Sequence, residues 1–241
     1  MKKCTEKFVE SAARRFAVCD LAVKSDTNPF RVSLTCDFPG IGRMTIEPFQ
    51  EKHFEAFRHF YDRCDPEWDL SAESRALCDQ HDTSNDTLSE IVRRVSSEED
   101  ARFLICTHNH VIGYILIEEI GRIKAGEKSF FGEDYYAELD MAVSDRFHGT
   151  GLASFGMLFL KLVAAIAGVG LGLITSPENE RAIRFYEKHG FIPAGHKEIY
   201  IPHTGERKAG QPWYVLEKNE LEEEEAQQSR LADREDAAAD A

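Results

Sequence analysis

The N-terminal part of the chain switches between helical and extended hydrophobic patterns. Residues 4–18 place apolar side chains at helical spacing, which predicts an amphipathic helix. Residues 31–36 and 43–49 alternate between apolar and polar positions and predict strands. Residues 53–63 return to a helical period, and the polar stretch that follows predicts a further helix ending near Val95.

The middle of the chain predicts a hairpin, a loop and another strand. Residues 101–109 and 110–122 are rich in aliphatic side chains and predict two strands that turn at Asn109. Residues 121–136 contain several turn-forming residues and predict a loop. Residues 137–144 then predict a strand.

The next segment predicts a long helix and a buried strand. The apolar positions of residues 152–166 define a helix buried on most sides, and residues 171–176 suit a short buried strand. Ser176 and Pro177 are expected to open another helix, which Gly190 ends as a glycine cap. Two strands, at residues 196–202 and 212–218, complete the prediction.

The turn before the long helix, RFHGTG, predicts an anion-binding loop. Strand, turn, helix and strand in this order form a crossover whose strands are parallel, which favours an α/β fold. The start of a helix offers unpaired N–H groups and the positive end of its dipole. Gly149 and Gly151 let a phosphate approach this backbone, and Arg146 adds a cation. The geometry of the turn alone explains the same glycines equally well.

A second pair of residues is compatible with ligand binding. Asn179 and Tyr186 are seven residues apart, which places both on one face of the predicted helix. An amide and a phenol could therefore face one bound ligand. A capping asparagine and a core tyrosine are the alternative explanation.

Charge and cysteine content narrow the class of protein. The net charge of the 241 residues is −14, and ten acidic and three basic residues give residues 217–241 a charge of −7. The remainder is also acidic, which argues against a nucleic-acid-binding protein. The six cysteines form no C-x-x-C pair, so we expect no metal site, and reduced thiols in a cytoplasmic protein.

Residues 152–174 have the length of a membrane span and carry a single charge, Lys161. That charge lies near the middle of the segment, where it is costly in a bilayer. Gly168, Gly170 and Gly172 interrupt the second half. We therefore expect no contact with a membrane, and the N-terminus has no apolar core of signal-peptide length.

Two segments, LDMAVSDRFHGTGLAS and ENERAIRFYEKHGF, resemble the GNAT superfamily of acyl-CoA-dependent N-acetyltransferases. The family's loop motif is matched by Arg146, Gly149 and Gly151. Its later motif is matched by a second set of residues, namely Asn179, Ala182, Phe185, Tyr186, Gly190 and Phe191. The resemblance covers roughly residues 43–217.

The resemblance implies a mixed, V-split sheet flanked by helices, with acetyl-CoA between two parallel strands. It implies that the loop backbone holds the pyrophosphate and that the main chain of residues 141–143 pairs with the pantetheine arm. The residues it assigns to the cofactor are Met141, Ala142, Val143, Arg146, Phe147, His148, Gly149, Thr150, Gly151, Leu152, Ala153, Asn179, Phe185 and Tyr186.

Candidate catalytic residues follow from the chemistry of acyl transfer to an amine. Tyr186 is expected to protonate the leaving thiolate, and the N–H of Val143 to polarise the thioester carbonyl. Glu138 and Asp140 share one face of the predicted strand and are candidates for the general base, with Glu138 ranked first. Glu118 and Glu119 on the neighbouring strand compete for this role.

The expected organisation has three parts: an N-terminal extension at residues 1–42, an acetyltransferase domain at 43–217 and an acidic, disordered tail at 218–241. The expected function is direct transfer of an acetyl group from acetyl-CoA to a primary amine, either a small amine or a peptide N-terminus. A silent acyl-CoA-binding module that acts through a protein partner is the alternative. The resemblance is also compatible with a homodimer.

Overall fold

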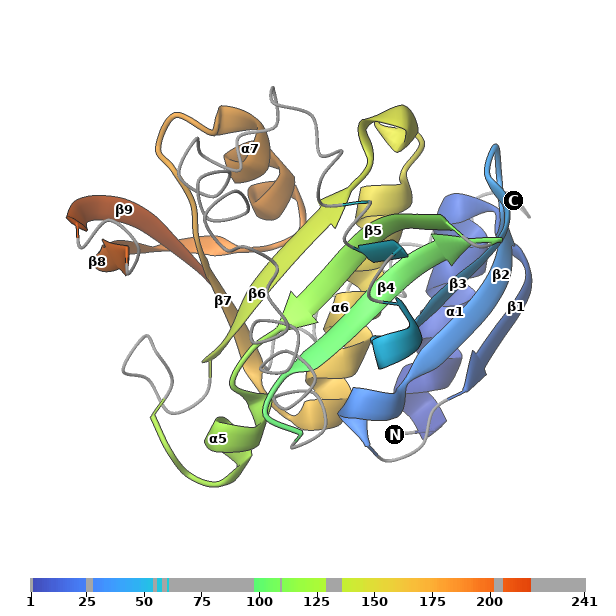
Figure 1. Cartoon of the computed structure of the whole chain (residues 1–241), viewed down its shortest axis with the longest axis horizontal. Helices are drawn as coiled ribbons and strands as arrows, with labels where there is room; N and C mark the ends of the chain where they lie inside the picture. Colours follow the sequence, from blue (N-terminus) through green and yellow to red (C-terminus); the bar gives the residue numbers. More distant parts are fainter. Residues whose placement is uncertain are drawn as a thin grey trace, which may run out of the picture.

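A nine-stranded sheet runs through the described part of the chain, in the order β1-β2-β3-β4-β5-β6-β7-β9-β8 (Figure 1). The computed structural model describes residues 2–24, 28–53, 56–57, 60, 98–108, 110–128, 136–201 and 206–217. The strands are β1 (Cys19–Lys24), β2 (Ser33–Phe38), β3 (Gly42–Pro48), β4 (Ala101–Thr107), β5 (His110–Ile117), β6 (Tyr136–Val143), β7 (Gly170–Ile174), β8 (Ile192–Ile201) and β9 (Glu206–Leu216).

The described α-helices flank this sheet. They are α1 (Lys2–Phe16), α5 (Ile120–Lys124), α6 (Leu152–Ala167) and α7 (Glu180–Lys188), and short 3₁₀ turns include η3 (Asp145–Phe147). Helices α1 and α6 lie next to each other behind the strands in Figure 1. The order of the elements confirms the expected mixed α/β fold.

The pairing of β6 with β7 is parallel, whereas every other strand pair in the sheet is antiparallel. The expected parallel crossover is therefore confirmed. The parallel pairing joins only residues 136–138 of β6 to β7. Residues 139–143 continue in register with β5 on the other side. The sheet thus splits beyond residue 138, which is the V shape that the resemblance implied.

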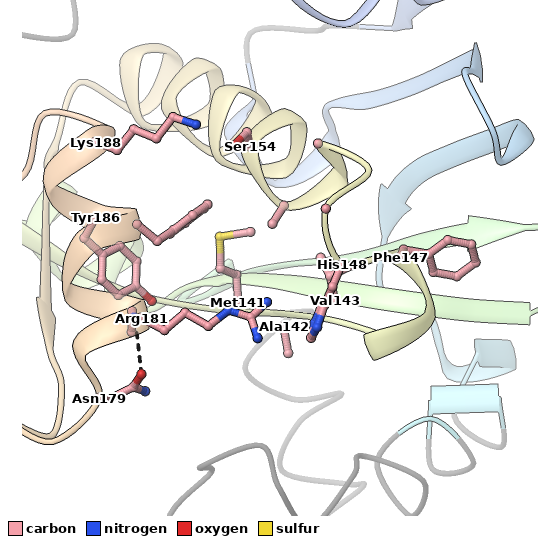
Figure 2. A pocket seen from close by; sticks show the side chains of 15 residues that line it. Met141, Ala142, Val143, Phe147, His148, Ser154, Asn179, Arg181, Tyr186 and Lys188 are labelled. Carbon is pink, nitrogen blue, oxygen red and sulfur yellow. Dashed lines mark hydrogen bonds between the residues drawn. The ribbon is translucent and has the colours of Figure 1, made fainter.

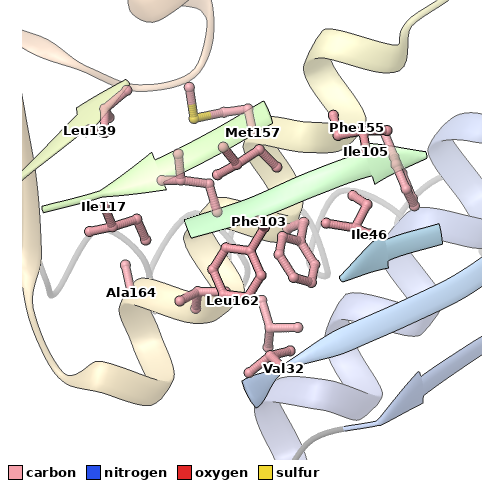
Figure 3. Packing of buried hydrophobic residues seen from close by; sticks show 14 of the residues in the cluster. Val32, Ile46, Phe103, Ile105, Ile117, Leu139, Phe155, Met157, Leu162 and Ala164 are labelled. Atoms are coloured by element: carbon pink, nitrogen blue, oxygen red, sulfur yellow. The ribbon is translucent and has the colours of Figure 1, made fainter. Parts of the chain in front are cut away.

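The long apolar helix α6 packs against the sheet and α1 through aromatic rings. Phe155 is fully buried, and its ring meets those of Phe8, Phe16 and Phe38 at centroid distances of 5.3–6.2 Å. Phe159 meets Phe103 of β4 edge-on at 5.1 Å. Figure 3 shows this layer, in which α6 covers β4, β5 and β6 with large side chains. The position of α6, and of the loop before it, is therefore fixed by a close-packed core.

Three predicted strand boundaries are wrong. The strands expected to begin at residues 196 and 212 begin earlier, at Ile192 and Glu206. The strand expected at residues 110–122 ends at Ile117, because Glu119 adopts a left-handed conformation and α5 begins after it. Gly121 lies so close to the chain that an added Cβ would be 2.4 Å from the Glu98 carbonyl oxygen. This close approach turns the chain, and part of the loop expected at residues 121–136 is helical.

The N-terminal elements lie in the same sheet as the rest. The helix expected at residues 4–18 is α1, and the strands expected at 31–36 and 43–49 are β2 and β3 within two residues. The sequence did not predict strand β1, because this strand lies at the edge of the sheet and its side chains are exposed or half-buried. The proposed domain boundary at residue 42 stays a prediction, although β2 and β3 pair across it.

Other expectations fall wholly or partly on residues outside the described ranges. These are most of the helix at 53–63, the helix ending near Val95, the turn residue Asn109 and the tail at 218–241. In the described ranges, no helix combines the length and apolarity needed to cross a bilayer. Residues 152–174 form α6, a glycine turn and β7 instead.

Replacing Phe155 should test how strongly the aromatic layer holds α6. We expect Phe155→Ala to lower the free energy of unfolding by about 3–5 kcal/mol, because it leaves a cavity among three rings. Urea unfolding measures this change. Leu158→Ala, at a half-buried site on the same helix, is the control and should cost less. A loss below about 1 kcal/mol for Phe155→Ala would contradict the packing described.

Candidate active site

A cavity of about 500 Å³ lies where β6 and β7 separate, between the start of α6 and helix α7 (Figure 2). Most residues predicted to hold the cofactor line it: Met141, Ala142, Val143, Phe147, His148, Gly149, Gly151, Ala153, Asn179, Phe185 and Tyr186. Its remaining lining residues are Ser154, Arg181, Ala182 and Lys188. The roles of all these residues stay predictions, but the structure brings them together.

The turn between β6 and α6 presents backbone to the cavity. Gly149 and Gly151 both have positive φ, at +74° and +88°, which favours glycine. Gly149 has open space where a Cβ would lie. Gly151 is the N-cap of α6 and has no side chain of its own at the helix start, where the Leu152 N–H donates to the Thr150 hydroxyl at 3.3 Å. This end of the helix can therefore receive an anion.

Three residues predicted to bind the cofactor lie outside the cavity lining. Leu152 is fully buried in the core. The Thr150 hydroxyl donates to the Phe147 carbonyl at 2.6 Å, so it is turned back into the loop. Arg146 is exposed, and its guanidinium lies 5.8 Å from the centre of the Phe147 ring.

The edge of β6 supplies main-chain groups to the cavity. Glu118 N–H donates to the Glu138 carbonyl, and Ser144 N–H donates to the Ile112 carbonyl. Alternate residues of β6, at 138, 140, 142 and 144, therefore direct their main-chain groups to β5. Those of Met141 and Val143 point to the other side, where β7 has diverged. Ala142 lines the cavity, but its main-chain groups face β5.

Helix α7 begins later than the sequence suggested. Ser176 and Pro177 precede the helix, which starts at Glu180, because Asn179 is the N-cap and its Oδ1 accepts from the Ala182 N–H at 3.0 Å. Asn179 is thus the capping residue of the alternative explanation and also lines the cavity. The helix ends before Gly190, as expected, whose φ is +84°.

The cavity is also lined by two cations that the sequence analysis did not predict, Arg181 and Lys188. Both lie on α7, seven residues apart, so they share one face of the helix, and both line the cavity together with Tyr186. Figure 2 shows the Arg181 side chain reaching between Tyr186 and His148. Their spacing of seven residues, which places two cations on one face of the predicted helix, could have identified them from the sequence. Burial lowers the pKa of His148, and the Arg181 charge lowers it further. The cavity wall is therefore cationic.

Tyr186 and Asp140 influence one another electrostatically. Burial raises the pKa of the Tyr186 phenol above 10, and the Asp140 charge raises it further. Asp140 accepts a hydrogen bond from the Tyr114 hydroxyl at 2.7 Å. Although Asp140 as a residue is exposed, desolvation by surrounding protein atoms raises the pKa of its carboxyl group, against the Tyr114 hydrogen bond.

None of the four candidate bases lines the large cavity. Glu138 and Asp140 lie outside the lining of the large cavity, and Asp140 lines a smaller one of about 40 Å³. Glu118 is 3.3 Å from the Arg102 guanidinium, and Glu119 is 2.8 Å from that of Arg122. Both carboxylates are thus engaged in ion pairs outside the lining of the large cavity.

A buried histidine joins α7 to α6 beside the cavity. His189 is 3% exposed, and its Nε2 lies 3.1 Å from the Oγ of Ser154. Burial lowers the pKa of His189 to about 3, and the charges of Lys161, Arg15 and Lys188 add to this effect. The imidazole is therefore neutral at physiological pH.

A sequence model of the acetyltransferase (GNAT) family matches residues 50–191, which include the glycine turn and α7. The chain belongs to the GNAT acetyltransferase family. It is an enzyme of the acyltransferase class, and enzymes of this family use acetyl-CoA. No curated protein matches the sequence significantly.

Solved structures show the same fold for this GNAT protein. A GNAT-family acetyltransferase from Streptococcus pneumoniae has a TM-score of 0.53 and 19% identity over 71% of this chain and 96% of its own. An N-acetyltransferase from Staphylococcus aureus has a TM-score of 0.54 and 17% identity over 73% of this chain and 98% of its own. A spermidine N-acetyltransferase from Vibrio cholerae, in complex with CoA and spermine, has a TM-score of 0.53 and 16% identity over 74% of this chain and 97% of its own.

The described part of this GNAT protein contains no cluster of three or more His, Cys, Asp or Glu side chains arranged to hold a metal ion.

Buried His189 should make the stability of this GNAT protein depend on pH. Its folded pKa of about 3 lies below the ordinary value of 6.5. Between these two pH values the imidazole is therefore protonated in the unfolded chain and neutral in the folded chain. The free energy of unfolding should therefore fall as the pH drops from 6.5 towards 3, with about 1.4 kcal/mol per pH unit from this group.

Urea unfolding between pH 7 and pH 5 measures this slope. His189→Gln keeps a hydrogen-bonding side chain near Ser154 but cannot titrate in this range, so the slope should flatten. His196→Gln removes an exposed histidine and should leave the slope as in the wild type. Equal slopes for the wild type and His189→Gln would contradict the prediction.

Proposed function

We propose that the protein transfers the acetyl group of acetyl-CoA directly to a primary amine. The observation that supports this most strongly is the cavity itself. It joins a glycine turn at a helix start, the edge of β6 that faces away from β5 and the half-buried phenol of Tyr186 within one space of about 500 Å³. Its size suits a cofactor-sized ligand.

The residues present fit an acyl-CoA. The amides of Gly149, Gly151 and Ala153, with Arg181, would hold the pyrophosphate, since the helix dipole and a cation both favour an anion. The outward-facing groups of Met141 and Val143 would pair with the amide groups of the pantetheine arm. A bound thioester of this kind supplies an acyl carbon that is open to attack by nitrogen.

Positioning makes the largest contribution in this proposal, because it turns a reaction between two molecules into one within a single complex. The Val143 N–H donates to the thioester oxygen and stabilises the negative charge that develops there. A bond forms between the amine nitrogen and the acyl carbon, and the bond from that carbon to sulfur breaks.

Tyr186 donates its proton to the sulfur that leaves. Its raised pKa keeps the phenol protonated across the neutral range, so the donor is always loaded. Asp140 accepts the proton that the amine loses. We favour Asp140 over Glu138, which the sequence ranked first, because its charge reaches Tyr186 and its raised pKa makes it a better proton acceptor.

A screen of acetyl-CoA consumption against a panel of amines tests the proposed function. The panel includes polyamines, aminoglycosides, amino acids and peptides with a free N-terminus, and calorimetry measures CoA binding in parallel. We expect binding together with turnover of at least one amine. Binding without turnover on any amine would favour the silent acyl-CoA-binding module, and absence of binding would overturn both functions.

Tyr186→Phe should lower kcat about a hundredfold, since it removes the proton donor but keeps the ring. The Kd for CoA should change by less than about threefold. Tyr214→Phe, at a buried tyrosine of β9 outside the cavity lining, is the matched control and should retain activity. A fall of less than about threefold for Tyr186→Phe would remove the proposed acid role.

Asp140→Asn and Glu138→Gln together identify the base. We expect Asp140→Asn to lower kcat/KM about a hundredfold, because the amide accepts no proton but keeps contact with Tyr114. The acid limb of the wild-type pH–rate profile should lie above the usual aspartate range, since the pKa of Asp140 is raised, and it should be lost in the variant. Glu138→Gln should stay within about threefold of the wild type; the reverse result would make Glu138 the base.

A further inference from the structure

A small cavity of about 40 Å³ lies over β4, β5 and β6, which run side by side in the sheet (Figure 1). Strand pairing places Arg102 of β4 opposite Leu116 of β5, and Leu116 opposite Asp140 of β6. Residues directly opposite one another direct their side chains to the same face of a sheet. All three residues line the cavity, so a guanidinium and a carboxyl group flank it with Leu116 between them. Two strand spacings separate the Cα atoms of the two charged residues by roughly 10 Å.

The small cavity lies on the face of the sheet that α6 does not cover. Helix α6 packs on the other face, where Phe159 meets Phe103 of β4. Ala142 of β6 lines the large cavity, and it packs in one hydrophobic cluster with Tyr114, which lines the small one. The two cavities therefore adjoin at β6, and a ligand group beside Asp140 would lie next to the strand edge assigned to the acyl-CoA.

The protein engages only part of the Arg102 guanidinium. Its Nη2 lies 3.1 Å from an Asp100 carboxylate oxygen and 3.3 Å from one of Glu118. Both hydrogen bonds to described residues come from this one nitrogen, and the buried Nε has no partner among them. The side chain is nevertheless 20% exposed and lines the cavity. A guanidinium is purely a donor, so Arg102 has N–H groups left for an oxygen of a ligand.

The charges around the cavity favour an ammonium group and a neutral oxygen over an anion. Asp100 and Glu118 lie against Arg102, and Asp140 lies on its other side, so three carboxyl groups surround one guanidinium. A carboxylate on the ligand would meet this excess of negative charge. A neutral carbonyl oxygen would accept from Arg102 without adding charge, and an amine nitrogen would be drawn to Asp140.

Aromatic rings form the remaining wall and favour polar contacts inside it. Phe57 meets Phe49 edge-on at 5.6 Å and Tyr114 edge-on at 5.9 Å. The Tyr114 hydroxyl holds Asp140 by a hydrogen bond of 2.7 Å. Apolar walls keep the local dielectric low, so a hydrogen bond from Arg102 to a ligand would count for more than in water. The small volume suits the head group of a ligand.

We propose that the acetyl acceptor is an amine whose α-carbon carries a neutral carbonyl group, as in an amino-acid amide or a peptide N-terminus, with its nitrogen at Asp140 and its carbonyl oxygen at the Arg102 guanidinium. The proposal rests on the proposed function, in which Asp140 takes the proton of the amine. Arg102 is a specificity-determining residue, because a hydrogen bond at the oxygen orients the nitrogen two bonds away. Alkyl amines lack this oxygen, and free amino acids carry a charged carboxylate in its place.

Initial rates with acetyl-CoA and three small amines, on the full chain, test the proposal. Glycinamide, propylamine and glycine are close in size, and kcat/KM is expressed per concentration of unprotonated amine because their basicities differ. We expect the value for glycinamide to exceed that for propylamine about tenfold, since propylamine leaves donors of Arg102 unpaired. It should exceed that for glycine by at least about tenfold, because the glycine carboxylate meets the surrounding carboxyl groups.

Arg102→Lys keeps the positive charge beside Asp100 and Glu118 but removes the planar set of donors. It should lower kcat/KM for glycinamide about tenfold and change that for propylamine by less than about threefold. Arg122→Lys is the matched control, since it makes the same change at an exposed arginine that also pairs with two carboxylates and lies outside both cavity linings. It should keep the wild-type preference.

Equal wild-type values for glycinamide and propylamine, or a higher value for glycine, would overturn the carbonyl site and leave the proposed function intact. A parallel loss on glycinamide and propylamine in Arg102→Lys would overturn the assignment of Arg102, because a structural role affects both amines alike. Turnover of another amine but of none of these three would overturn the acceptor class alone. Turnover of no amine at all would overturn the proposed function as well.

Discussion

The separation of β6 from β7 is the constraint on which the candidate site depends. The two strands pair through residues 136–138 only, and beyond this point β6 follows β5 alone. Main-chain groups in a sheet normally satisfy one another, so a strand that loses its neighbour must find other partners. Here the open edge faces a cavity instead of a strand. The split therefore turns ordinary backbone into a binding surface.

The core maintains that split by holding α6 in place. The rings of Phe155 and Phe159 lie on one side of α6 and meet α1, β2 and β4. The same helix presents its first amides to the cavity at its N-terminus. Packing and binding therefore use different parts of one helix. Because side chains in such a core cannot shift independently, the glycine turn is held at a fixed distance from the strand edge.

The sequence was sufficient to predict the elements with strong periodicity. The helix at 152–166 and the strands beside it were found because their apolar positions recur regularly. The sequence did not predict edge strand β1, because its side chains are barely buried. It did not predict the turn at Glu119 either, because that turn depends on contact between Gly121 and Glu98, which is distant in the chain. Likewise the motif located Asn179 and Tyr186, whereas the packing of Phe16 against Phe155 at the start of α6 arises from tertiary structure alone.

The cap at the start of α7 limits what Asn179 can recognise. Its Oδ1 is engaged by the Ala182 N–H, as the dashed line in Figure 2 shows, so only the Nδ2 group can turn to a ligand. That group is purely a donor. A ligand at this position would therefore meet the Nδ2 donor most readily through a carbonyl or phosphate oxygen. Aspartate would cap the helix equally well but would face the same oxygens with a negative charge. Asparagine therefore combines the helix cap with a neutral hydrogen-bond donor that suits an oxygen of the ligand.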